Sequence, residues 1–309
     1  MVYVDDFKMS GPAENMAKGW KLIKEGLSID TPGPASKMLG CYHREGTGTV
    51  NGKKVRTMEY DMCEFMESCV TAYKDACNEP TMKLKKVDTP FIPAPEGSGN
   101  APAEWQEGDE RGVLQPIAAS VLMKVMYGAR MARWDLLKII QLLATRITKW
   151  SKDCDKALHR LISYIESTKH YVLRGFIAED ETNLELRLYA DADFAGDRPG
   201  YKSTSGVFLT LAGSDSCFPL SAKAARQTAV SHSTVEAEVA AADVAARTIG
   251  LPQLDLWESL AKSSNLWEKL LDRRVKLTLI EDNESTYQII KTGRNPTMRH
   301  ISRTHGVNI

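Results

Sequence analysis

The chain has 309 residues, enough for one or two domains that each bury a core. Forty basic residues balance forty acidic ones, so the net charge gives no overall signal for binding to nucleic acid. The six cysteines have no C-x-x-C spacing, which argues against a zinc site or disulfide framework and indicates reduced intracellular thiols. The sequence has neither an apolar run long enough for a membrane span nor the apolar stretch of a signal peptide.

The first predicted element is a tight β-hairpin at residues 1–7. Three apolar residues run into Asp5 and Asp6, which would lie at its tip. Acidic hairpin tips are common, so the segment alone indicates only a structural turn. Helical spacing predicts a helix over 13–30, and an Asn-Gly pair within 47–56 predicts a second hairpin.

The next segments are predicted to form a helix, a basic strand and a linker. Residues 58–77 carry a Met-rich apolar stripe at helical spacing, which we interpret as core. Three lysines within 83–86 indicate a basic strand able to lie near a phosphate backbone. Residues 90–112 are rich in Pro, Gly and Glu, a composition that cannot build a core, so a flexible or extended linker is expected over 90–116.

Two helices are predicted at 117–147 and 153–168, in a locally basic region. Residues 124–174 contain eleven basic and four acidic residues. Such a surface grips a nucleic-acid backbone with an affinity that falls with salt; a solvated helix face is the alternative. The candidate nucleic-acid-binding residues are Lys124, Arg130 and Arg133 here, and Lys223 and Arg226 in a later basic turn.

The stretch 184–193 alternates apolar and polar residues, which predicts a half-buried strand. The same alternation places Asp191 and Asp193 on one face, at the end of that strand. Two such carboxylates repel each other unless a cation lies between them, and Mg²⁺ prefers oxygen ligands. An acidic turn after an edge strand is the alternative.

Two further elements each bring an acid. β-prone segments at 201–211 and 216–227 precede an Ala-rich helix in which Ser233 and Glu236 have capping-box spacing. Glu238 has no such role and lies on a stripe of alanines small enough to press against a sheet, where a carboxylate is unexpected unless it is a ligand.

The last predicted strand, 275–282, also alternates and ends in an acid, Asp282, before a helix at 284–291. Three separate elements therefore each deliver one acid without a structural role: Asp191, Glu238 and Asp282.

Five blocks resemble the RNase H domain of copia-type LTR retrotransposons, in the same order and at similar spacing: YADADFAGD, KSTSGVFL, STVEAEVAAAD, EDNEST and RHISRTH. The resemblance covers most of 183–309. It implies an α/β (α+β) fold, an RNase H-like mixed sheet with flanking helices. It also implies cleavage of the RNA strand of RNA–DNA hybrids, with Asp191, Glu238 and Asp282 binding two Mg²⁺ (or Mn²⁺) ions.

The chain departs from this family where a fourth carboxylate usually stands, because Ser302 occupies that place and brings no charge to a second metal ion. Asp193 is a candidate substitute. His300 and His305 are interpreted as surface histidines, with a role in product release as the alternative.

The first seven residues, MVYVDDF, resemble the catalytic hairpin of the reverse transcriptase palm, which precedes RNase H in the same family. This implies that Asp5 and Asp6 would hold Mg²⁺ during nucleotide addition. The earlier palm strand with a third aspartate and the fingers are absent from the sequence, so we expect no unaided DNA polymerisation. The block Arg133-Trp134-Asp135 also resembles the family, which commonly has proline at the position of Trp134.

The resemblance divides the chain into five regions: a partial palm (1–56), the start of the thumb (57–89), a linker (90–116), a helical thumb or connection (117–172) and a C-terminally truncated RNase H domain (173–309). The expected partners are an RNA–DNA hybrid, template–primer nucleic acid and the missing upstream Pol region, but no membrane. The expected location is the cytoplasm, within virus-like particles, or the nucleus. The alternatives are a non-catalytic transposon remnant that at most binds nucleic acid, and a helical nucleic-acid-binding module over 117–170.

Overall fold

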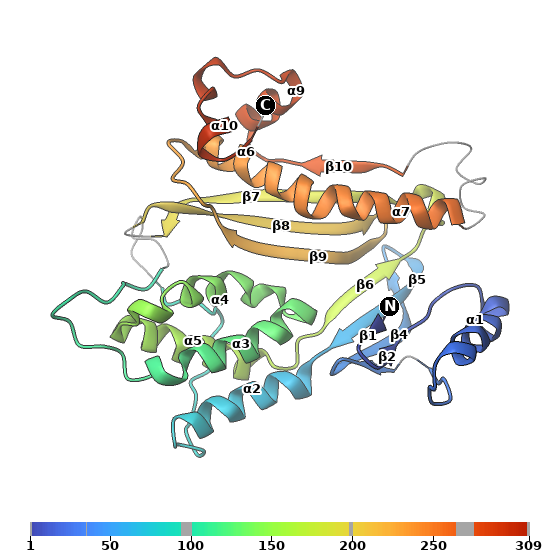
Figure 1. Ribbon diagram of the computed structural model, residues 1–309, viewed down its shortest axis with the longest axis horizontal. Coiled ribbons are helices and arrows are strands. Elements are labelled where there is room, and N and C mark those ends of the chain that lie inside the picture. Colours follow the sequence, from blue (N-terminus) through green and yellow to red (C-terminus); the bar gives the residue numbers. More distant parts are fainter. Residues whose placement is uncertain (1, 35, 94–100, 198–199, 264–274, 308–309) are drawn as a thin grey trace.

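The computed structural model of the chain describes residues 2–34, 36–93, 101–197, 200–263 and 275–307. These residues form a mixed α/β architecture with one large mixed sheet and flanking helices (Figure 1), as predicted. Helices α6 and α7 lie along one side of the β7–β9 layer, and α3, α4 and α5 lie on the other (Figure 1). No helix within these ranges is long and apolar enough to cross a membrane. The six cysteines are all unpaired.

The large sheet has the strand order β10-β7-β8-β9-β6-β5-β4-β3. Only the β10–β7 pairing is parallel; the other pairings are antiparallel. The strands are β3 (Lys37–Met38), β4 (Cys41–Val50), β5 (Lys53–Asp61), β6 (Leu173–Ile177), β7 (Glu185–Asp197), β8 (Lys202–Ala212), β9 (Cys217–Arg226) and β10 (Leu277–Ile280).

Helices cover both faces of the sheet and extend beyond it. They are α1 (Ala13–Gly26), α2 (Cys63–Ala76), α3 (Gln115–Ala132), α4 (Leu137–Ala144), α5 (Lys152–Thr168), α6 (Thr234–Ala245), α7 (Leu251–Ser263), α9 (Glu284–Thr292) and α10 (Ile301–Thr304). Short 3-10 turns lie at Trp134–Leu136, Ile147–Lys149, Glu181–Asn183 and Pro296–Met298, and a π turn at Ala246–Gly250 joins α6 to α7.

The predicted N-terminal hairpin is present as a separate two-stranded sheet. Strand β1 (Val2–Tyr3) pairs with β2 (Asp6–Phe7), and Tyr3 lies opposite Asp6. Helix α1 follows and buries no residue, so its apolar face makes only shallow contact with the hairpin.

The second predicted hairpin is also confirmed. Asn51 and Gly52 join β4 to β5 with φ of 50° and 78°, and two consecutive positive φ values match the twist of a two-residue hairpin. Strand β5 runs to Asp61, so the helix predicted over 58–77 begins only at Cys63 and its first residues pair in the sheet. The predicted palm–thumb boundary at 56/57 therefore falls within β5.

The long helix predicted over 117–147 is broken. Arg133 leaves helical geometry (φ −119°, ψ 63°), and a 3-10 turn leads into α4. The break lets α3 and α4 pack together with α2 and α5 around one apolar core that includes Leu122, Ile140 and Leu158. Long apolar side chains hold this layer together, because burying each one stabilises it by roughly 1.5–3 kcal/mol.

The described part of the predicted linker packs against the helical layer. The carboxylate of Glu104 pairs with Arg146 and Lys149, and Arg111 forms an isolated bridge with Ser151. Residues 94–100 lie outside the described residues. The basic strand predicted at 83–86 is wrong, because this segment has no strand pairing.

The second core lies between the sheet and α6. Leu186 and Leu188 of β7 pack against Ala242 and Ala245 of α6. A Cβ on Gly250 would lie only 2.8 Å from a Leu188 methyl group, so the turn after α6 approaches the sheet more closely than a larger residue allows. This close packing fixes the position of α6 over β7.

Candidate metal centre

Asp191 and Asp282 meet where β10 leaves the sheet. The last residue pair of these parallel strands is Ile280 with Tyr189, and Asp282 and Asp191 each lie two residues further along. Both carboxylates are exposed to solvent. The predicted strand end at Asp193 is wrong, because β7 continues to Asp197 through an irregularity in its pairing with β8. Asp191 therefore lies within β7, next to the point where β10 ends.

Glu238 reaches the same edge from α6. The Ser233 hydroxyl caps the helix by accepting a hydrogen bond from the Glu236 amide at 3.2 Å. Ala237 and Ala241 then pack on Ala192 of β7, and these small side chains bring the helix close to the strand. Glu238 is consequently buried.

The charges of the predicted acids act on one another. Burial, together with the negative charges of Glu281, Asp191 and Asp282, raises the pKa of Glu238 to about 7. The Oε2 atom of Glu238 is buried and has no hydrogen-bond partner within the described ranges. The charges of Asp191 and Asp282 therefore act on Glu238, but among the described residues these acids do not form a group that could hold a metal ion.

Glu281 is a fourth carboxylate at this place, which sequence reasoning missed. Burial and the charges of Asp282 and Asp191 raise its pKa. One of its oxygens accepts a 3.2 Å hydrogen bond from the Asn283 amide, and Oε2 is buried without a partner in the described residues. The sequence signal was the pair of adjacent acids at 281 and 282, but the strand pattern predicted a site role only for Asp282.

The donor set suits a hard divalent cation. Four carboxylates offer only oxygen ligands, which Mg²⁺ and Mn²⁺ prefer. Within the described part of the chain, no three His, Cys, Asp or Glu side chains form a group that could hold a metal ion.

Asp193 does not join the cluster. Its carboxylate forms an ion pair with Lys138 of α4, on the face of β7 away from α6, to which strand alternation also assigns Asp191. Its charge is also not among those that raise the pKa of Glu238.

The C-terminal histidines and Ser302 lie next to the start of α6. His305 Nε2 lies 3.1 Å from Glu236 Oε1 and His300 Nε2 lies 3.3 Å from Oε2. The His305 side chain is only 3% exposed, so interpreting it as a surface histidine is wrong. Burial alone would raise the pKa of Glu236, but the His232 amide and the two imidazoles outweigh it and lower that pKa. Ser302 is exposed, and its hydroxyl donates to the Arg299 carbonyl at 3.4 Å.

Two of the predicted nucleic-acid-binding residues have structural partners. Arg133 is 1% exposed, forms an ion pair with Asp135 and donates to Thr168. Arg226 pairs with Asp197, which is fully buried. The Arg133 side chain is therefore enclosed, whereas that of Arg226 remains 29% exposed.

The remaining three are nearer the surface. On α3, Arg130 is exposed and the Lys124 ammonium lies 5.5 Å from the centre of the Phe65 ring. The Lys223 ammonium donates to the Thr248 hydroxyl at 3.4 Å. Ion pairs within the molecule neutralise most other cations of the basic region 124–174.

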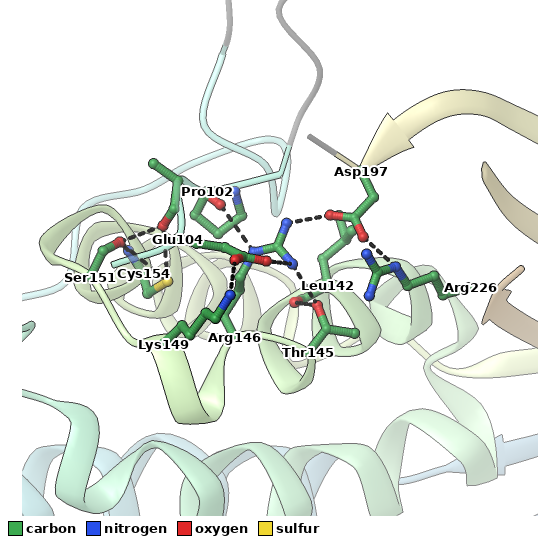
Figure 2. Close-up of polar contacts among 11 residues, drawn as sticks. Pro102, Glu104, Leu142, Thr145, Arg146, Lys149, Ser151, Cys154, Asp197 and Arg226 are labelled. Atoms are coloured by element: carbon green, nitrogen blue, oxygen red, sulfur yellow. Dashed lines mark hydrogen bonds and ion pairs between the residues drawn. The ribbon is translucent and has the colours of Figure 1, made fainter. Parts of the chain in front are cut away.

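A buried ionic network lies where the helical layer meets β7. Figure 2 shows Asp197 between Arg146 and Arg226, with Glu104 and Lys149 on the other side of Arg146. Arg146 also donates to the Pro102 carbonyl at 3.3 Å. The network ties the end of β7 and the described part of the 90–116 segment to the region after α4.

Asp5 and Asp6 lie apart from these acids. Both are exposed on the two-stranded hairpin. In Figure 1 this hairpin lies beside β4, below the layer that contains β7 and β10. The structure therefore separates the predicted polymerase acids from the predicted nuclease acids.

Comparison with known proteins gives one partial similarity. Over 155 residues the chain is 28% identical to a retrovirus-related Pol polyprotein from transposon RE1 of Arabidopsis thaliana. The match covers 50% of this chain and 10% of that polyprotein, so the matched half of the chain spans about a tenth of its relative. No protein-family model and no solved structure matches the chain. The similarity supports a retrotransposon-derived chain related to Pol polyproteins.

Proposed function

We propose that the chain is a retrotransposon-derived ribonuclease that hydrolyses the RNA strand of RNA–DNA hybrids with Mg²⁺ or Mn²⁺. The observation that carries the proposal is that Asp191 and Asp282 lie two residues beyond the last residue pair of β7 and β10, with Glu238 near enough for their charges to raise its pKa. Three acids from separate elements come close enough to interact, and a buried acid with a strongly shifted pKa beside other charges is typical of a functional site.

Asp191, Glu238 and Asp282 would hold the metal, and Glu281 would supply the fourth carboxylate that Ser302 cannot. Two bound ions generate a hydroxide from water and stabilise the departing oxygen of a phosphodiester. With a pKa of about 7, Glu238 is partly protonated at neutral pH. It must release this proton to become a ligand, so metal binding would be coupled to proton release. Exposed Asp191 and Asp282 would face the incoming phosphate.

The proposed partners are an RNA–DNA hybrid and, in the context of a longer Pol chain, a template–primer. Lys124 and Arg130 on α3 remain the candidates for phosphate contacts, because Arg130 is exposed and Lys124 is partly exposed beside the Phe65 ring. Asp5 and Asp6 would act as polymerase ligands only when the remainder of a palm is present.

A cleavage assay tests the proposal directly. The full chain is incubated with Mg²⁺ and a hybrid whose RNA strand is end-labelled. We expect cut RNA with the wild type, none with Asp191→Asn, and wild-type cleavage with Asp255→Asn, a control for an exposed acid on α7. Absence of cut RNA from the wild type at every Mg²⁺ and Mn²⁺ concentration overturns the proposal.

The second candidate is a non-catalytic remnant that keeps the fold and binds nucleic acid. Ser302 in the place of a carboxylate favours it, as does the spread arrangement of the four acids. This candidate predicts that the hybrid is bound in a gel-shift assay and that its RNA strand stays intact.

A further inference from the structure

A groove next to the helical layer includes Asp191 in its lining. It lies between the sheet face of β7, β8 and β9 and the segment that contains Trp134 and Lys138. Its volume is about 270 Å³, close to the lower end of the range of about 300–1,000 Å³ for small-molecule sites. One of the proposed metal ligands therefore lines the groove.

Three aromatic side chains line this groove. The centre of the Phe208 ring lies 5.9 Å from that of Trp134 and 5.8 Å from that of Tyr189, with interplanar angles of 69° and 45°. Neither pair is stacked face to face, and Trp134 and Phe208 meet edge to face. Tyr189 is 37% exposed.

The rest of the lining combines small residues with charged side chains. Ala222 and Ala224 are small, and a Cβ built on Gly206 would meet nothing nearer than 3.7 Å. The Lys138 ammonium lines the groove while pairing with Asp193. The lining also includes Lys223 and the acids Asp135 and Asp191, so its charges balance. Small walls and aromatic side chains suit a flat aromatic group.

We propose that this groove binds an unpaired nucleobase of the nucleic-acid strand whose phosphate lies at the acidic cluster. The inference rests on the proposed function, because it names a substrate contact beside the same site. Bases stack on aromatic side chains in many single-strand binding proteins, and such stacking is sequence-tolerant because every base has a flat face.

The test uses single-stranded DNA, which contains no RNA strand to cut, so its result does not depend on cleavage. Anisotropy of a fluorescein label measures binding to the full chain in Mg²⁺, for an oligonucleotide and for an abasic strand of equal length and charge. We expect the wild type to prefer the base-containing strand about tenfold, the change that one stack of roughly 1.4 kcal/mol produces.

Trp134→Leu should remove this preference and leave the affinity for the abasic strand unchanged. Trp105→Leu is the matched control, because both indoles are half-buried and donate to a backbone carbonyl, at 3.3 Å from Trp134 and 2.7 Å from Trp105. Tyr189→Leu is a second groove variant, used if circular dichroism shows that Trp134→Leu does not fold.

Equal affinity of the wild type for the two strands overturns the inference, as does a preference that survives in folded groove variants. A preference that depends on Trp134, found in a chain that cuts no hybrid, refutes the proposed nuclease and retains the groove. Cleavage of the hybrid by a chain that has no preference for the base-containing strand refutes the groove and retains the proposed nuclease.

Discussion

Arg146 and Asp197 form an ion pair from which water is excluded, with side chains 1% and 0% exposed. Arg146 follows α4, and Asp197 ends the strand that carries Asp191. The pair therefore joins the helical layer to the sheet near the proposed metal centre. Charges removed from water depend on each other, because an unpaired buried charge recovers none of its lost hydration.

Asp197→Asn should lower the free energy of unfolding by about 3–5 kcal/mol, since it leaves Arg146 and Arg226 without their shared counter-charge. Urea denaturation measures the change. Asp153→Asn is the control: its pair with Lys156 is solvent-exposed, so little or no change is expected. Equal midpoints for Asp197→Asn and the wild type would show that the network is not structural.

Glu238→Gln should stabilise the metal-free protein above neutral pH. The folded-state pKa of Glu238 is raised from 4.5 to about 7, so the wild type loses stability as pH rises through that interval. At pH 8 in a chelator, the variant should gain roughly 1–3 kcal/mol, and the gain should vanish near pH 4.5. Denaturant titrations at the two pH values provide the measurement.

Addition of Mg²⁺ supplies the control for this prediction. The ion should stabilise the wild type at pH 8 by neutralising the cluster, and should stabilise Glu238→Gln much less. A variant that is no more stable than the wild type at pH 8 argues against mutual repulsion of these acids.

Glu185→Gln should have the opposite pH dependence. Lys276, Arg187 and Thr278 lower the pKa of Glu185 to about 2. A lowered carboxyl pKa stabilises the fold above the unfolded value of 4.5, and this stabilisation is lost as pH falls toward 2. Because both cations reach solvent, we expect a loss of about 1 kcal/mol at pH 7 that fades below pH 4.5. A constant difference between pH 7 and pH 2.5 would contradict this account.

Local patterns predicted those elements whose signals lie within a few residues. The Asn51-Gly52 turn requires two positive φ values, and alternation in β7 places Leu186 and Leu188 in the core. The break at Arg133 has no comparable local signal, because a tertiary core rather than helix propensity decides where α3 stops. The same holds for β5, whose extension to Asp61 depends on pairing with distant β6.

In the candidate site, too, the features with a local signal were predicted and those that depend on distant elements were not. Asp191, Glu238 and Asp282 were predicted because each lacked a local structural role, and the structure places their charges within reach of one another. The burial of Arg133 and the pairing of Asp193 with Lys138 were not predicted, because each depends on which distant element packs against it.

Binding of Mn²⁺, followed by the loss of the electron paramagnetic resonance signal of the free ion, tests the central claim most directly. We expect the wild type to have a saturable site at neutral pH that Asp191→Asn and Asp282→Asn abolish and the exposed-acid control Asp255→Asn retains. Saturation curves that are identical in all four proteins, or absence of saturable binding to the wild type, would contradict a metal centre built from these acids.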